Sequence, residues 1–397
     1  MKTTFSIFIM SFILSLYNQA YAVNAEFFSH PEEIILYNEN QPNAKGLKKC
    51  AFVDTKQYSC LFLESPFIGH QKEKVTIKDV MNKTMASRKS YLETFENVLK
   101  MMPEETLMMF GPVNAVVISD RINPSFYSFD SGAIYISSSY LWKTAEEKEL
   151  SSAKKDFRDD FGSTINFSEE ADYYKNGESL YKSVKQTTRT EIDLAPILFK
   201  VLFHELSHAN DFFPRSFYIS DDVNVSKTYS EMASDRLDDG YLLSQKIRLS
   251  SALLERTSEI LYFGKDPNDI ELNMNPRYVV REFIEGDASD LYAYSNPRED
   301  LAMLVENNLM FYYFGYSPVT IFIKYPKANF KVPKNYKKPI LGGVKNKIAA
   351  PLVKERSKSV LTMIFGADYA EKVITKLEKV KQVIIPENIS WEKLKNI

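Results

Sequence analysis

The sequence has few cysteines and few long apolar runs, and it lacks the motifs of several common activities. Its 397 residues include two cysteines, and no stretch after the N-terminal segment approaches the roughly 18 uninterrupted apolar residues of a membrane-spanning helix. We find no internal repeat, phosphate-binding glycine loop, nucleophilic-serine signature or nucleic-acid-binding module. The formal charge of −2 gives no general attraction to nucleic acid. We therefore expect neither a nucleic-acid partner nor a transmembrane anchor in the mature chain.

The longest apolar run lies at the N-terminus. Lys2 is followed by apolar residues from Phe5 to Tyr17 and then by Ala20-Tyr21-Ala22, whose small residues suit a cleavage site. The run is short for a membrane span, so we expect a signal peptide over residues 1–22 and an exported protein, either periplasmic or secreted. An exported chain with two cysteines most simply pairs them, and we expect a disulfide between Cys50 and Cys60.

Histidine is also scarce, yet two of the four histidines stand close together. His204 and His208 belong to an H-E-x-x-H segment, with Glu205 after the first histidine. Four residues are nearly one helical turn, so both imidazoles project from one face and can bind one metal ion. Glu205 then lies beside the metal and can act as general base for a water molecule. The flanking residues are apolar, which predicts a buried helix with Pro196 in its first turn and Asp193 as its cap.

A catalytic zinc usually has three protein ligands, so a third ligand must lie elsewhere in the chain. In the segment 292–302, Tyr292 precedes Glu299 by seven residues and Ala302 follows it by three. This spacing resembles the third-ligand segment of the anthrax lethal factor type of metallopeptidase. The resemblance implies that Glu299 is the third ligand and that Tyr292 donates its hydroxyl to the oxyanion. Pro297 places Glu299 in the first turn of a helix.

A second segment competes for the same role. Glu231-Met232-Ala233-Ser234-Asp235 resembles the E-x-x-S-D segment of the thermolysin type of metallopeptidase. That resemblance implies Glu231 as the ligand and Asp235 as the partner that orients His204. We favour Glu299, because the match at Tyr292 is independent of the match at the glutamate, and Glu231 stays open as the alternative.

Together these segments resemble HExxH zinc metallopeptidases of the zincin fold, in particular the gluzincins. The resemblance implies an α+β fold: a zincin-like catalytic domain with a small mixed sheet and an active-site helix, and a mostly helical C-terminal part. We expect this organisation along the chain: a signal peptide at 1–22, a disulfide-containing region at 23–74, the metallopeptidase domain at 75–330, and a basic linker with a helical appendage at 331–397.

Periodicity and turn residues locate several elements within this organisation. We expect a helix over 75–102, closed by Pro103, and strands at 113–119 and 133–137. The second strand is our candidate for a sheet edge that binds an extended substrate, or else a purely structural strand. The polar stretch 143–189 predicts a surface insertion with one or two helices, and the lysine-rich segment 324–358 predicts a solvated connecting region.

The predicted function is that of an exported zinc-dependent metallopeptidase that acts on a protein or peptide, with Zn²⁺ as its cofactor. Two alternatives stay open: a catalytically inactive zincin-fold protein of the cell envelope, and an amidase that acts on cell-wall peptides. The sequence does not indicate the oligomeric state or the cleavage specificity.

Overall fold

The computed structural model describes residues 25–53, 60–151, 161–162, 165–181, 187–221, 223–325 and 337–394. The expected signal peptide at 1–22 lies outside these residues. The chain divides into two compact units, described separately below: Met1–Asp156 with Gln186–Leu243, and Phe157–Lys185 with Ser244–Ile397. Each unit combines helices with a five-stranded sheet, so the fold is α+β, as predicted. Among the described residues, no helix is both long enough and apolar enough to cross a membrane.

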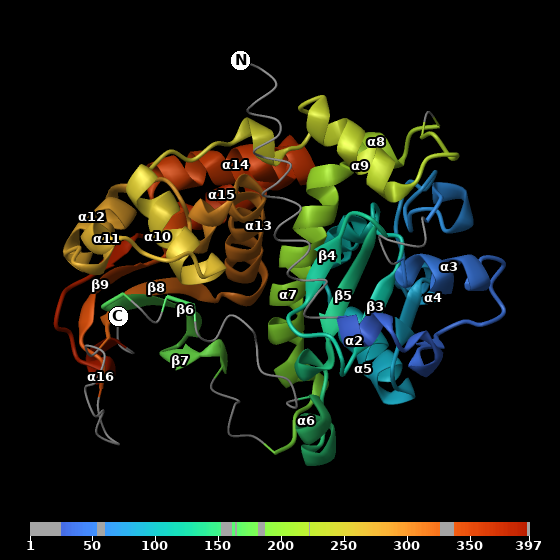
Figure 1. The fold of residues 1–397 in the computed structure, drawn as a ribbon, viewed down its shortest axis with the longest axis horizontal. Helices are drawn as coiled ribbons and strands as arrows, with labels where there is room; N and C mark the ends of the chain where they lie inside the picture. Colours follow the sequence, from blue (N-terminus) through green and yellow to red (C-terminus); the bar gives the residue numbers. More distant parts are fainter. Residues whose placement is uncertain are drawn as a thin grey trace. The chain divides into compact units, whose positions relative to one another are not determined.

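The first unit contains a mixed sheet with the strand order β1-β2-β3-β5-β4 (Figure 1). Its strands are β1 (Ile35–Leu36), β2 (Thr84–Ala86), β3 (Val116–Ser119), β4 (Phe126–Ser128) and β5 (Ala133–Ser137). β2, β3 and β5 run parallel, whereas β1 and β4 are antiparallel to their neighbours. Of the two roles expected for residues 133–137, the sheet edge is wrong and the purely structural strand fits, because β5 is an inner strand and β4 lies at that edge. All five residues of β5 are buried, as expected for a continuous apolar run that is covered on both faces.

Helices surround this sheet, and the long helix expected over 75–102 is not one of them. That region contains two helices separated by strand β2, because residues 84–86 leave the helical path to pair with β3. The helices of the first unit are α2 (Ala25–Phe28), α3 (Ala44–Ala51), α4 (Ile77–Asn82), α5 (Lys89–Leu99), α6 (Ala145–Ser151), α7 (Glu191–Phe212), α8 (Arg215–Tyr218) and α9 (Tyr229–Asp238). Short 3-10 helices lie at Pro31–Glu33, Phe62–Glu64, Glu104–Phe110 and Ser138–Tyr140.

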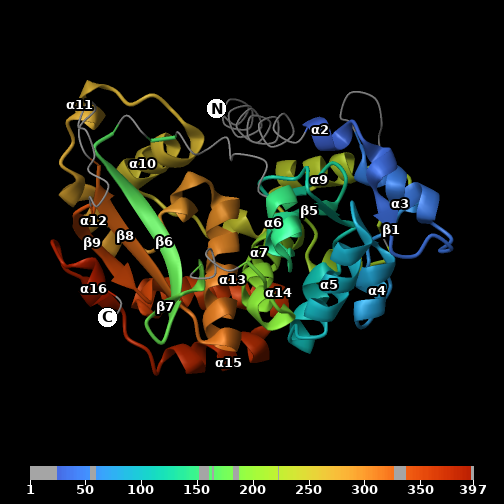
Figure 2. The ribbon, with the colours of Figure 1, turned by 90° about the horizontal axis from the view of Figure 1, so that it is seen from below.

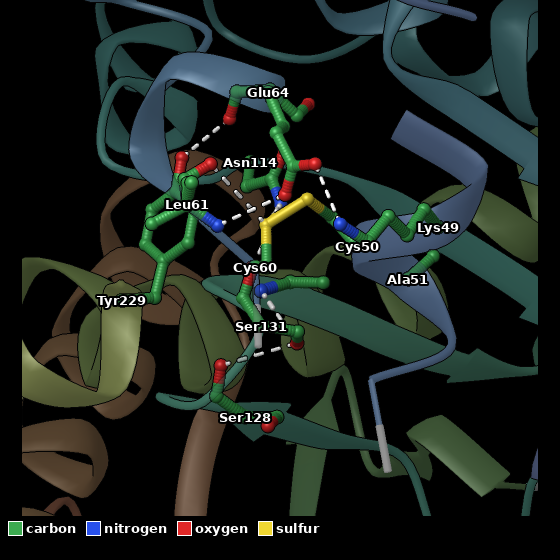
Figure 3. The surroundings of a disulfide bond; sticks show 12 residues. Lys49, Cys50, Ala51, Cys60, Leu61, Glu64, Asn114, Ser128, Ser131 and Tyr229 are labelled. Atoms are coloured by element: carbon green, nitrogen blue, oxygen red, sulfur yellow. Dashed lines mark hydrogen bonds and ion pairs between the residues drawn. A yellow bond between two sulfur atoms is a disulfide. The ribbon is translucent and has the colours of Figure 1, made fainter. Parts of the chain in front are cut away.

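A disulfide joins two segments of the first unit, as predicted (Figure 3). Cys50 lies near the end of α3, Cys60 precedes the 3-10 helix at Phe62–Glu64, and neither side chain is exposed. The carbonyl of Cys60 accepts a hydrogen bond from the backbone N–H of Tyr229, the first residue of α9. Both cysteines pack in one apolar cluster with Phe212 and Phe213 at the end of α7. The disulfide therefore belongs to the apolar cluster in which α7 ends and α9 begins.

The second unit contains an antiparallel sheet with the order β10-β9-β8-β6-β7 (Figure 2). Its strands are β6 (Phe167–Lys175), β7 (Glu178–Ser179), β8 (Ser317–Lys324), β9 (Ile340–Lys345) and β10 (Val383–Ile385). Three of these strands differ from the sequence-based expectation. β6 and β7 lie in the stretch expected as a surface insertion, and β9 lies in the segment expected as a connecting region. The polar composition of β6 hid the strand, because only Phe167 and Tyr173 of its nine residues are buried and the polar residues do not alternate regularly with apolar ones.

The remaining part of the second unit is mostly helical. Its helices are α10 (Ala252–Phe263), α11 (Asp269–Leu272), α12 (Pro276–Glu285), α13 (Pro297–Phe314), α14 (Pro351–Phe365), α15 (Ala367–Leu377) and α16 (Trp391–Leu394). Three of these helices, α10, α11 and α12, lie between α9 and Pro297. Short 3-10 helices lie at Ser244–Lys246, Tyr292–Ser295 (η8) and Lys347–Ala349. α13 forms the centre of this helical part, since all residues from Asp300 to Met310 are buried.

Candidate metal centre

Helix α7 carries the H-E-x-x-H segment in its second half. The helix begins five residues before Pro196, so this proline lies inside the helix and not in its first turn as expected. The cap is Thr190: its backbone N–H and its hydroxyl both donate to Asp193 Oδ2, each at 2.8 Å. Asp193 was expected to be the cap itself, and it instead holds the capping residue from the third position of the helix. α7 also packs against β4, so the sheet supports the helix.

His204 and His208 differ from every other residue in this part of α7. They are partly exposed, whereas all the other residues from Val201 to Phe212 are buried. The two imidazole rings lie 4.9 Å apart between centroids, at an interplanar angle of 84°. Glu205, between them, is 7% exposed. A helix buried on its other faces thus presents two nitrogen ligands, with a nearly buried carboxylate beside them.

Glu299 is the third member of the group. It lies in the first turn of α13, where its backbone N–H donates to the side chain of Asn296, the capping residue. His204, His208 and Glu299 each offer one ligand atom, and these atoms lie within 4.8 Å of one another. This His-His-Glu group could hold a metal ion. Two imidazole nitrogens and one carboxylate oxygen form a donor set that suits zinc and several other transition metals, so the donors alone do not identify the metal.

Tyr292, the predicted oxyanion donor, lies in η8, directly before α13. Its backbone N–H donates to Asp290 Oδ1 at 2.8 Å. Its ring is partly buried and contacts the ring of Tyr262 edge to face, with 4.9 Å between centroids. Since η8 packs against α13, Tyr292 and Glu299 are carried by one continuous piece of the second unit.

The alternative ligand Glu231 is engaged elsewhere. Its carboxylate accepts hydrogen bonds from the backbone N–H and the hydroxyl of Thr228, at 2.8 and 2.9 Å, and so caps the start of α9. These bonds to Thr228 lower the pKa of Glu231. Asp235, the predicted partner of His204, forms a salt bridge with Lys227. Among the described residues, Glu231 and Asp235 belong to no group that could hold a metal.

Asp211 follows His208 by three residues on the same helix and is completely buried. The charge of Asp211 partly offsets the lowering of the Arg236 pKa that burial causes. Arg236 also donates to the backbone carbonyls of Phe212 and Tyr241. Asp211 and Arg236 therefore support the end of α7 from α9.

A second group with metal-ligand spacing lies at the start of the first unit. His30, Glu32 and Glu33 also bring their ligand atoms within 4.8 Å of one another, but both glutamates are exposed. Glu33 accepts hydrogen bonds at both oxygens from Arg121, at 2.8 Å each. Because a cation already engages this carboxylate, we assign no function to the group.

Sequence reasoning missed a set of buried polar residues in the second unit. Glu169 of β6 accepts a hydrogen bond from the Tyr262 hydroxyl of α10, at 2.6 Å. Burial and the neighbouring charge of Asp290 raise the pKa of Glu169 well above its usual range. In the sequence Glu169 looks like one acid in a polar stretch, and only the strand pairing brings it to Tyr262.

Comparisons with protein-family models, curated proteins and solved structures found no match to this chain. The function is therefore argued from the residues of the site.

Proposed function

We propose that the protein is an exported zinc-dependent metallopeptidase. One observation carries the proposal: His204 and His208 are the only partly exposed residues in an otherwise buried part of α7, and Glu299 brings a carboxylate to them. Two imidazoles and a carboxylate are the ligands of one major class of zinc peptidases. A purely structural role for two such histidines would not account for the third ligand.

The residues around the group suit the hydrolysis of a peptide bond. A bound zinc ion would act as a Lewis acid and make a water molecule acidic enough to lose a proton near neutral pH. Glu205 takes this proton and passes it to the leaving amine. At 7% exposure, the Glu205 carboxylate is largely shielded from bulk water. Tyr292 donates its hydroxyl to the oxyanion that forms on the attacked carbonyl.

The first sheet offers a place for an extended substrate. β4 is at the end of the strand order, and α7 packs against it. A peptide could add its backbone to such an edge as a further strand. The disulfide between Cys50 and Cys60 supports export, because disulfides persist mainly outside the cytoplasm.

The test compares wild type with Glu205→Gln and, as a control on the same helix, Glu191→Gln. Glu191 lies at the start of α7 and binds Lys143, so its loss should leave hydrolysis unchanged. We expect Glu205→Gln to retain zinc, measured by elemental analysis, and to lose roughly 10²- to 10⁴-fold in the hydrolysis of quenched fluorescent casein.

Cell-wall peptides tested beside casein separate the amidase alternative from the peptidase. If only the cell-wall fragments are cleaved, and their cleavage depends on Glu205, the protein is an amidase and not a peptidase. Bound zinc without Glu205-dependent cleavage of either substrate would identify a non-catalytic protein. Failure of the wild type to bind zinc, manganese, iron or cobalt would reject the metal site itself.

A further inference from the structure

Three residues of the second unit form a contact chain that ends on Tyr292. Glu169 Oε2 accepts the hydroxyl hydrogen of Tyr262 at an oxygen–oxygen distance of 2.6 Å. The Tyr262 ring then meets the Tyr292 ring at an interplanar angle of 77°, with 4.9 Å between centroids. An edge-to-face pair of this kind stabilises the contact beyond the effect of the apolar area that it buries. The contact therefore favours one orientation of the Tyr292 ring.

Glu169, the first residue of this contact chain, occupies a position that costs stability. Glu169 is fixed in β6 by pairing with β8, where it lies opposite Phe322. Its second oxygen, Oε1, is buried and has no hydrogen-bond partner. A buried polar atom without a hydrogen-bond partner destabilises the folded state, because its hydration is lost and not replaced. A leucine at this position would pack without leaving a buried oxygen unpaired. The presence of a carboxylate therefore indicates a role other than packing.

Tyr292 is fixed at its backbone as well as at its ring. Its N–H donates to Asp290 Oδ1 at 2.8 Å, which holds the start of η8. With the backbone and the ring both oriented, the direction of the phenol oxygen is determined. A hydrogen-bond donor for an oxyanion must be placed in advance, because its contribution depends on the distance to the developing charge.

We propose that Tyr262, held by Glu169, is a positioning residue that orients the Tyr292 hydroxyl toward the oxyanion. The inference rests on the peptidase function proposed above. Tyr262 and Glu169 act through Tyr292 and do not touch the substrate. Their loss should therefore lower the rate of the chemical step and leave substrate binding nearly unchanged.

The first experiment measures kcat and KM with quenched fluorescent casein. Tyr262→Leu removes the ring contact, and we expect kcat to fall about 10- to 100-fold while KM stays within about twofold. Tyr262→Phe keeps the ring and loses only the bond to Glu169, so kcat should fall a few-fold. Glu169→Gln retains an acceptor oxygen and should be close to wild type. The matched control is Tyr278→Leu, a change at a tyrosine of the same unit that is 56% exposed, and it should change neither constant.

The second experiment repeats Tyr262→Leu in a Tyr292→Phe background. Phenylalanine has no hydroxyl to orient, so the second change should lower kcat by no more than about twofold. An equal loss in both backgrounds would overturn the inference, because Tyr262 would then act by another route. A Tyr262→Leu variant that raises KM and leaves kcat intact would overturn it as well.

These outcomes are distinct from a failure of the peptidase proposal. Equal casein hydrolysis by wild type and Glu205→Gln would contradict both the proposed peptidase function and the inference about Tyr262. A Glu205-dependent peptidase in which Tyr262 and Tyr292 act additively would remove only the inference. Thermal unfolding of each variant identifies losses of activity that come from unfolding.

Discussion

The two helices that carry the three residues that could hold a metal ion present them in different ways. In α7, His204 and His208 lie in the second half of a long helix whose neighbouring residues are buried. In α13, Glu299 lies in the first turn, three residues after the capping residue Asn296. Side chains in the middle of a packed helix are fixed by the core, whereas those in a first turn depend on the cap. We therefore expect Glu299 to be the ligand that is more easily displaced.

The two units also differ in how their interiors are stabilised. The inner strands β3 and β5 of the first unit are completely buried, and a disulfide lies in a neighbouring cluster. The described interior of the second unit also holds several acids and tyrosines, and the Tyr173 hydroxyl lies within hydrogen-bond distance of Glu306 and Asn307. Both units bury apolar clusters; the first adds a covalent link, and the second adds these polar contacts.

The largest expected effect distinguishes the two candidate glutamates. Glu299→Ala should weaken zinc binding by more than the roughly 10- to 100-fold that is typical when a residue behind a ligand is lost. Glu231→Ala should leave zinc binding unchanged, because Glu231 caps α9 and binds Thr228. Competition between each variant and a chelator for zinc measures the zinc affinities of Glu299→Ala and Glu231→Ala. If Glu231→Ala alone releases zinc, the thermolysin-type assignment is correct and ours is wrong.

The second effect concerns the disulfide. Replacing both Cys50 and Cys60 by serine should destabilise the first unit by about 2–4 kcal/mol, because the unfolded chain gains freedom. The chain has two tryptophans, Trp142 in the first unit and Trp391 in the second. In urea, the fluorescence of a Trp391→Phe variant reports the first unit, and that of a Trp142→Phe variant reports the second. In the double serine variant, only the urea midpoint of the first unit should decrease. An equal decrease of both midpoints would show that the two units unfold together.

The sequence predicted which residues meet at the candidate site better than it predicted the surrounding fold. His204, Glu205 and His208 lie within five residues of one helix, so their joint placement depends on helix geometry alone, and Glu299 had a proline and a tyrosine at informative spacing. The disulfide and the α+β class were predicted from cysteine count and motif resemblance. Strand β6 was missed because its side chains are mostly polar. Glu169 and Tyr262 are 93 residues apart in sequence, and no local pattern indicates that they meet.

A smaller effect tests the contrast between the two helices. Asn296→Ala removes the acceptor for the backbone N–H groups of Arg298 and Glu299, and should cost about 1 kcal/mol of stability. Because the same turn holds Glu299, zinc affinity should fall as well. Thr190→Ala, at the start of α7, should cost similar stability but leave zinc affinity unchanged, since the histidines lie 14 or more residues further along the helix. If Asn296→Ala and Thr190→Ala bind zinc with equal affinity, the expected difference between α13 and α7 is wrong.

A further effect is a pH dependence of stability that both units share. Burial lowers the pKa of Lys83 in the first unit and of Lys347 in the second, each to about 8 from 10.5. Below pH 8 both lysines are charged in the folded and unfolded states, and the folded state bears the full cost of the buried charge. As the pH rises from about 8 to about 10.5, the folded protein loses these protons first, so the two lysines contribute increasing stability.

Methionine variants isolate this contribution. Unlike wild type, Lys83→Met and Lys347→Met lack the titrating group, so wild-type stability should rise relative to each variant between about pH 7 and about pH 10. Lys89→Met is the control, because the Lys89 side chain is 82% exposed and should show no such drift. Urea unfolding at the two pH values measures each difference. The stability difference from wild type could change with pH for Lys347→Met alone. Lys83, whose amine donates to Ser65 Oγ at 2.9 Å, would then keep its charge despite burial.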